Sequence, residues 1–334
     1  IPFFIEQLIS SLNDQRIIEK KGNKYYLSRE IREVIIPSTI QDVIMARVDL
    51  LPEQAKGLLQ KGAVAGREFS HRLIKKVAAL AEEELLSYLS VLKDSKLLYE
   101  RGIYPQSNCV FKHALTQEVA YNSLLLNRKR EIHQQIGEAL EQIYPERIDE
   151  FSEMLAYHSL QGEDWQRVYK YSREAGLKVF SHSAYEEAQR YFEDGLTALK
   201  KLPSEKIRIE QEIDLRFHMR SALVPLGRHE EWSEWVRGAE LLAREIHDDA
   251  RLSNALNLLS SLHWMKGQTP KAITLGYLLF HWSLDFATVP QVATMVTTIP
   301  IFVGLANLWL NKQPFSGAKI ISGISAMIGV ALLL

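Results

Sequence analysis

The sequence changes character abruptly near residue 270, and this change constrains the fold of the 334-residue chain more than any other feature. Residues 1–270 carry 37 Lys and Arg and 40 Asp and Glu. Residues 271–334 carry only four charged side chains, namely Lys271, Asp285, Lys312 and Lys319. Because a charged side chain is costly to place in hydrocarbon, we expect a globular body in water followed by a C-terminal segment that prefers lipid.

Two stretches of the C-terminal segment predict membrane-spanning helices. Residues 290–310 contain 21 residues without a charge, which is long enough to cross a hydrocarbon core as a helix. Residues 318–334 are a shorter candidate, and Pro314 and Gly317 predict a turn between the two. A hydrophobic hairpin buried in a soluble protein stays open as the alternative. We expect residues 271–334 to form a transmembrane helical hairpin, which would anchor a cytoplasmic body to the inner or plasma membrane.

The overall charge and the cysteine content exclude several classes of protein. A formal net charge of -1 gives the whole chain no attraction to nucleic acid or to an anionic membrane surface. Cys109 is the only cysteine, so neither an intramolecular disulfide nor a cysteine-rich zinc site can form. The histidines show no H-E-x-x-H spacing, and no nucleophile, base and orienting group can be assembled. We therefore expect no metal site and no catalytic site.

Most of residues 1–270 predicts α-helix, because apolar residues recur at intervals of three and four. Ser38 and Thr39 supply N-cap oxygens for the first clear helix, and Pro52 is suited to the first position of the next. Ser70 precedes a third helix. The fold class expected for this part of the chain is mainly α.

A further helix over residues 81–95 is followed by β-prone runs and turn residues over 97–113, which predict a hairpin. Helices followed by such a hairpin are typical of a winged helix, a common DNA-binding module. The helix over 81–95 begins with three glutamates, Glu82, Glu83 and Glu84, which would repel phosphate. We therefore expect nucleic acid not to be a partner.

Internal repetition begins near residue 150. Aligning residues 163–176 with residues 183–196 matches four pairs: Trp165 with Tyr185, Val168 with Ala188, Tyr171 with Tyr191, and Ala175 with Gly195. Glycines at 162, 227 and 267 recur at distances close to two repeats and one repeat of tetratricopeptide size. Such arrays bind partners on a concave face and catalyse nothing by themselves. The matched aromatic side chains fit a core between helices better than a ligand cage, although both interpretations stay open.

Three long and correctly ordered boxes resemble the region after the nucleotide-binding core in signal-transduction ATPases with numerous domains, the STAND or AAA-like class. They are IPFFIEQLI at 1–9, IPSTIQDVIMARVDLLPEQAKGLLQKGAVAGREFS at 36–70, and CVFKHALTQEVAYNSLLLNRKREIHQQIGEALEQIY at 109–144. The resemblance covers residues 1–270 and implies three regions. They are the end of the NTPase lid region at 1–48, a winged-helix domain at 49–125 and tetratricopeptide-like helical repeats at 126–270.

The resemblance implies a regulatory or scaffolding region rather than an enzyme. The sequence contains no G-x-x-x-x-G-K-[ST] motif, hence no backbone cradle and no lysine for nucleotide phosphates. We expect this polypeptide alone not to hydrolyse ATP, so that ATP or ADP and magnesium belong only to a longer parent protein. The implied partners are a protein or a small inducer on the repeat face and the upstream NTPase core. The apolar stretches 290–310 and 318–334 add a lipid bilayer as an expected partner.

Two residues are candidate remnants of the nucleotide site. Pro2 is similar to the proline of the family's glycine-x-proline box, which lies against the adenine, although the preceding glycine is absent. His113 is similar to the winged-helix histidine that contacts the bound diphosphate in that family. An imidazole that donates to phosphate is reasonable near neutral pH. The alternative for His113 is a cap on the helix that follows it.

Residues 273–334 have a weaker resemblance to the last helices of drug/metabolite transporters of the EamA type. The alternative function is therefore a fragment of such a transporter fused to the soluble region. A carrier of that type needs two multi-helix halves, so transport by this segment alone is not expected. The junction near residue 270 falls inside an expected repeat helix, which is consistent with a fusion.

Overall fold

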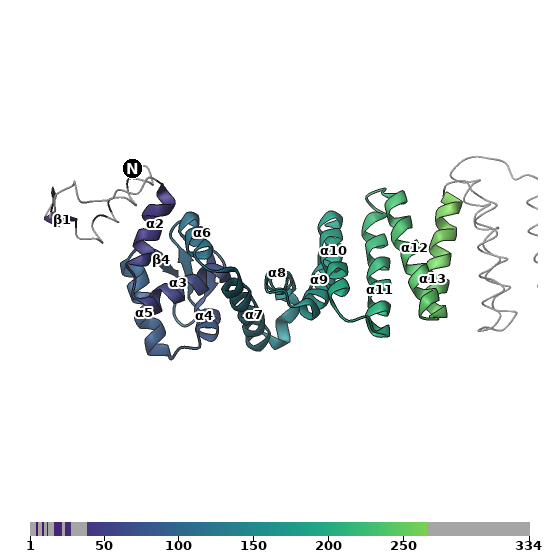
Figure 1. The fold of residues 1–334 in the computed structure, drawn as a ribbon, viewed down its shortest axis with the longest axis horizontal. Coiled ribbons are helices and arrows are strands. Elements are labelled where there is room, and N and C mark those ends of the chain that lie inside the picture. The colour runs from purple at the N-terminus through teal and green to yellow at the C-terminus, as the bar shows by residue number, and fades with distance from the viewer. Residues whose placement is uncertain are drawn as a thin grey trace, which may run out of the picture. The chain divides into compact units, whose positions relative to one another are not determined.

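The computed structural model describes residues 39–265 continuously, residues 17–21 and 24–27, and the single residues Ile5, Ile9 and Leu12. These residues form a mainly α fold with 12 α-helices, one three-stranded antiparallel sheet and one two-stranded hairpin (Figure 1). The predicted transmembrane helices and Pro2 lie outside the described residues. Within the described part of the chain, every helix is too short or too polar to cross a bilayer.

Contacts between residues divide the chain into two compact units. The first contains residues 1–182 and 193–202, and the second contains residues 183–192 together with those from 203 onward. Near the N-terminus, β1 (Ile18–Lys21) pairs antiparallel with β2 (Lys24–Leu27). Neither strand is predicted above, although the Gly-Asn pair that separates them in sequence is a common two-residue hairpin connection.

The first unit contains the helices and strands between residues 40 and 181. They are α2 (Ile40–Asp49), α3 (Glu53–Ala65), β3 (Glu68–Ser70), α4 (His71–Ala78), α5 (Glu82–Asp94), β4 (Leu98–Arg101), β5 (Asn108–Phe111), α6 (Ala114–Asn122), α7 (Leu126–Ile143), the 3-10 helix η2 (Pro145–Phe151), α8 (Ser152–Gln161) and α9 (Trp165–Ser181). The next helix, α10 (Tyr185–Lys201), contributes residues to both units.

Two of the predicted helix caps are confirmed by side-chain hydrogen bonds. The Thr39 hydroxyl accepts from the backbone N–H of Asp42 at 3.2 Å at the start of α2, and the Ser70 hydroxyl accepts from that of Leu73 at 3.1 Å at the start of α4. Each bond satisfies an N–H group that has no partner inside its helix. Pro52 is the N-cap of α3, so this helix begins one residue later than predicted.

The predicted hairpin is confirmed, and a third strand joins it. β4 and β5 pair antiparallel, while β3 pairs with the other edge of β5, so the strand order is β3-β5-β4. Phe69 of β3 and Phe111 of β5 are buried and meet edge to face, with ring centroids 6.1 Å apart. Gly62 of α3 makes room for the Phe69 ring, because a Cβ at residue 62 would lie 2.6 Å from the ring. The sheet and α3 therefore share one core.

The second unit is built on three consecutive helices. They are α11 (Lys206–Leu223), α12 (His229–Glu245) and α13 (Asp249–Met265). α12 packs against both α11 and α13. The buried side chains Ile213, Val236 and Ala239 form part of the core between them.

Three turns between helices share one backbone geometry. Glu163, Gly227 and His247 have left-handed conformations, with φ of 54°, 69° and 53°. The backbone N–H of each of these residues donates to the carbonyl three residues earlier in the chain. The backbone N–H of the residue that follows donates to the carbonyl five residues before it. This is the hydrogen-bond pattern of a Schellman helix end. The chain therefore repeats a turn that stops one helix and starts the next.

These turns correct the use of glycine as a repeat marker. Gly227 is the left-handed residue of its turn, whereas Gly162 is right-handed, and Glu163 after it takes the left-handed conformation. The two glycines are therefore not equivalent positions. A Cβ at Gly162 would meet the Gln134 side chain at 2.9 Å, so Gly162 is required for close packing rather than for the turn. Gly267 lies outside the described residues.

Candidate functional site

An arginine bridge joins α7 and α9, the first and third of three consecutive helices in the first unit. Asp164 caps α9 by accepting from the backbone N–H of Arg167, and it also accepts from Nη1 of Arg167 at 2.8 Å. Nη2 of Arg167 donates to Glu141 of α7 at 3.1 Å. Glu141 accepts in turn from the Tyr171 hydroxyl. Burial, and to a smaller extent this hydrogen bond, raises the pKa of the Tyr171 phenol. The bridge therefore ties the start of α9 to α7 across the α7–α8–α9 unit.

The same bridge occurs in the second unit. Asp248 caps α13 by accepting from the backbone N–H of Arg251, and it accepts from Nη1 of Arg251 at 2.6 Å. Nε and Nη2 of Arg251 donate to the two carboxylate oxygens of Asp214 on α11, each at 2.8 Å. The carboxylates raise the pKa of the guanidinium. The α11–α12–α13 unit thus repeats the arrangement of α7–α8–α9, with an arginine of the third helix bound to an acid of the first.

The middle helix of each three-helix unit presents large apolar side chains to solvent. On α8 these are Met154 and Tyr157, which are 41% and 51% exposed. On α12 it is Leu241, which is 67% exposed. Single exposed apolar residues are ordinary. Because they recur on the equivalent helix of both groups, α8 and α12 each present a candidate partner-binding surface within their own unit.

The aromatic residues matched by the sequence alignment are wholly or partly buried rather than arranged as an open cage. Trp165 and Tyr185 are the first residues of α9 and α10, as the alignment predicts, and both are partly buried. Tyr171 is fully buried, whereas Tyr191 is only partly buried, and the next residue, Phe192, takes the buried position of α10. The interpretation as a core between helices is therefore supported.

Tyr157 also covers a buried pair of histidines that sequence analysis did not single out. His133 of α7 and His158 of α8 are 1% and 2% exposed, and their Nδ1 atoms lie 2.8 Å apart. One imidazole must donate and the other must accept, so both cannot be protonated at these atoms. Burial lowers the pKa of His133 to about 4 and that of His158 to about 3, with smaller contributions from Lys129 and from His133 respectively. The pair is neutral at physiological pH and serves packing.

His113, the candidate phosphate contact, lies between β5 and α6. It occupies the N-cap position of α6 with an extended backbone, and its side chain makes no capping hydrogen bond. The position expected under the capping alternative is therefore correct, but the side chain does not act as a cap. Pro2, the other candidate, is outside the described residues. Contact of His113 with a nucleotide stays a prediction.

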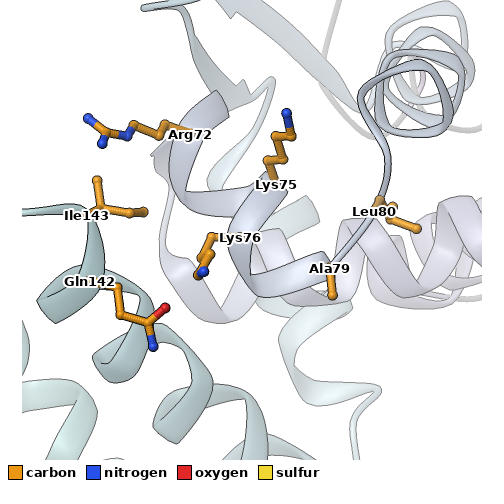
Figure 2. A pocket seen from close by; sticks show the side chains of 7 residues that line it. All are labelled: Arg72, Lys75, Lys76, Ala79, Leu80, Gln142 and Ile143. Atoms are coloured by element: carbon orange, nitrogen blue, oxygen red, sulfur yellow. The ribbon is translucent and has the colours of Figure 1, made fainter.

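A hollow with a basic rim lies between α4 and the end of α7. It has a volume of about 610 Å³, and its lining residues are Arg72, Lys75, Lys76, Ala79, Leu80, Gln142 and Ile143. Figure 2 shows Lys76 turned toward Gln142 and Arg72 extended over Ile143, whereas Lys75 points away from α7. Lys75 binds Glu82 at 2.5 Å. Arg72, Lys75 and Lys76 lie at one residue and its third and fourth neighbours in HRLIKKVA, and this spacing could have revealed a basic face on α4, although not the end of α7 that completes the hollow.

Other chemical candidates are not supported among the residues that the structure describes. Between residues 39 and 265 and in the N-terminal fragments, three or more metal-ligating side chains nowhere come together. Cys109 is buried in the sheet, and burial raises the pKa of its thiol to about 11. A protonated, buried thiol is a poor nucleophile.

Of the comparisons with known proteins, the one with solved structures gives a match. No family model and no curated protein matches the chain. Among solved structures, it resembles a signal-transduction ATPase with numerous domains (STAND) that carries a tetratricopeptide repeat sensor, from Pyrococcus horikoshii. The match has 12% sequence identity and a TM-score of 0.33, and it covers 90% of this chain and 48% of that one. The chain therefore spans about half of that structure, and at this TM-score we base no argument on the match.

Proposed function

We propose that this chain is a regulatory and scaffolding region of a signal-transduction ATPase, in which a winged helix precedes tetratricopeptide-like repeats that sense a partner or a small inducer. The observation that carries the proposal is the repeated arginine bridge, with Asp164 and Arg167 in one unit and Asp248 and Arg251 in the other. Together with the shared turn geometry, it supports a helical array built from a repeated group of three helices.

The three helices α3, α4 and α5 and the sheet β3-β5-β4 support the assignment of a winged helix. The start of its third helix is acidic, and Glu82 is engaged by Lys75, His71 and Tyr104. Ile103, in the connection between β4 and β5, is 85% exposed and apolar. An acidic helix start and an apolar hairpin tip favour contact with protein over contact with a phosphate backbone.

The exposed apolar residues Met154 and Tyr157 of α8 are the surface on which we place the partner. A photo-crosslinking amino acid at position 157 should capture a discrete partner in cells, and Met154→Ser in the same helix should reduce the yield severalfold. Leu86→Ser is the matched control, because Leu86 of α5 is also apolar and 41% exposed. Equal yields from all three proteins would contradict the assignment of this surface.

ATP turnover tests the proposal that the chain is not an enzyme by itself. The purified chain should release no phosphate from Mg-ATP above the level of a buffer blank. An upstream reading frame that encodes a P-loop should restore turnover when it is joined to the chain. In that longer protein, His113→Asn should lower the amount of co-purified ADP, whereas His182→Asn, at an exposed residue after α9, should not. Robust turnover by the chain alone would refute this part of the proposal.

A further inference from the structure

The basic hollow beside α4 has more positive charge than the surrounding fold uses. Lys75 is neutralised by Glu82. In the part of the chain that the structure describes, neither Arg72 nor Lys76 has a carboxylate within ion-pair distance or a side-chain hydrogen-bond acceptor. The Arg72 guanidinium lies over the Tyr144 ring, 5.7 Å from its centre. One guanidinium group, of Arg72, and one ammonium group, of Lys76, therefore face a common hollow with their donors open to a ligand.

The position of Arg72 is not explained by the stability of α4. Lysines in the last turn of a helix are favoured by the helix dipole, which accounts for Lys75 and Lys76. Arg72 lies in the first turn of the same helix, where the dipole disfavours a cation. It is also one turn from Lys76, a like-charge pair that weakens an isolated helix. An anion held by both groups would remove this repulsion.

The geometry of the hollow indicates the class of ligand. Side chains four residues apart on a helix have Cβ atoms about 6 Å apart, so both cations can reach one phosphate. An arginine fork matches two phosphate oxygens, and the Gln142 amide can donate from the facing helix. Ala79, Leu80 and Ile143 supply an apolar wall. A hollow of about 610 Å³ falls within the range of small-molecule sites, about 300–1,000 Å³.

We propose that this hollow binds a small phosphorylated metabolite, with its phosphate between Arg72 and Lys76 and its organic part against Leu80 and Ile143. The inference stands on residues of α4 and α7 alone and does not depend on the proposed function. A polyanion such as DNA, or an anionic lipid surface, would use the same charges but would have no use for the apolar wall.

Isothermal titration of the full chain with glucose 6-phosphate and with AMP tests the proposal, with glucose, a 20-base-pair duplex DNA and phosphatidylglycerol vesicles as references. At least one of the two phosphorylated probes should bind, and glucose should not. The double variant Arg72→Gln/Lys76→Gln should weaken that binding at least about tenfold, because each removed cation loses a charge-assisted contact. The control Lys200→Gln/Lys201→Gln removes two exposed lysines from α10 and should change the affinity less than about twofold.

Circular dichroism and the 31P chemical shift of the probe complete the experiment. Both double variants should retain the helical spectrum, since all four side chains are exposed. A shift of the probe's 31P resonance that is lost only in the Arg72→Gln/Lys76→Gln protein would support the proposal. Absence of binding by both phosphorylated probes at 10 mM, or equal losses in the two variants, would overturn it. Tighter binding of DNA or vesicles than of the small phosphates, abolished by the same substitutions, would also overturn it.

Discussion

The buried histidine pair should make the α7–α8 region sensitive to acid. An unfolded histidine has a pKa near 6.5, whereas burial holds the pKa of His133 at about 4 and that of His158 at about 3. Since the pKa of each histidine is lower in the folded chain than in the unfolded chain, the contribution of the pair to the free energy of unfolding is complete above pH 6.5. It is lost as the pH falls from 6.5 toward 4. At pH 5, each buried imidazole lowers the free energy of unfolding by about 2 kcal/mol relative to its value above pH 6.5, so the pair lowers it by about 4 kcal/mol.

The neighbours of the pair do not offset this cost. The hydroxyl of Tyr121 in α6 lies 3.4 Å from Nε2 of His133. The pKa of this hydroxyl is raised, chiefly by burial. The Lys129 ammonium lies 4.3 Å from the centre of the Tyr121 ring and lowers the pKa of His133 further. No carboxylate in the described residues forms an ion pair with either imidazole. Protonation therefore places a charge in a site without a counter-ion.

Hydrogen exchange of the α7 and α8 peptides at pH 7.5 and pH 5, corrected for intrinsic rates, measures the effect. The opening free energy should fall by about 4 kcal/mol in the native chain and much less in His133→Leu/His158→Leu. NMR should show the ring resonances of both histidines unchanged between these pH values, and titrating in concentrated urea. Titration of either ring near pH 6.5 in the folded chain would refute the reasoning.

Three further changes test the packing of the first unit. Gly62→Ala should destabilise the first unit by about 1–3 kcal/mol, because the added Cβ displaces the Phe69 ring. Gly57→Ala, in the same helix with no atom within 4 Å of the added Cβ, should stabilise the first unit by up to about 1 kcal/mol. The labelling rate of the Cys109 thiol should therefore rise in the first variant and fall in the second. Ala79→Gly should raise the melting temperature, because Ala79 has a φ of 53° and glycine removes a strain of about 1 kcal/mol; a lower melting temperature would contradict this. The Cys109 thiol should react with a disulfide reagent at pH 8 about 100-fold more slowly than in the unfolded chain, since its pKa is raised from 9.0 to about 11; comparable rates would show that the sheet is open.

Local signals in the sequence predicted local structure well. Thr39 and Ser70 were identifiable as caps, because an N-cap bond joins residues three apart. The β4–β5 hairpin was identifiable from its turn residues. Strand β3 was not, because its three residues acquire a strand conformation only by pairing with β5, about 40 residues later in the chain.

The site features depend on contacts between distant segments, and sequence patterns reveal these poorly. The Asp-x-x-Arg spacing at Asp164 and Asp248 is visible in the sequence, but the acids that complete each bridge, Glu141 and Asp214, lie on helices far earlier in the chain. The basic hollow needs the end of α7 to face α4, which no periodicity indicates. His113 and Pro2 were proposed by resemblance, and their nucleotide contacts stay predictions.

The recurrence of one arginine bridge in both units has a consequence for how such a protein can evolve and be engineered. Arg167 and Arg251 each join the first and third helices of one group through side chains of that group alone. A group of three helices can then be duplicated, deleted or exchanged as a module, and only its seams with adjacent modules must be redesigned. Binding specificity could diversify in one module while its neighbours keep their sequence.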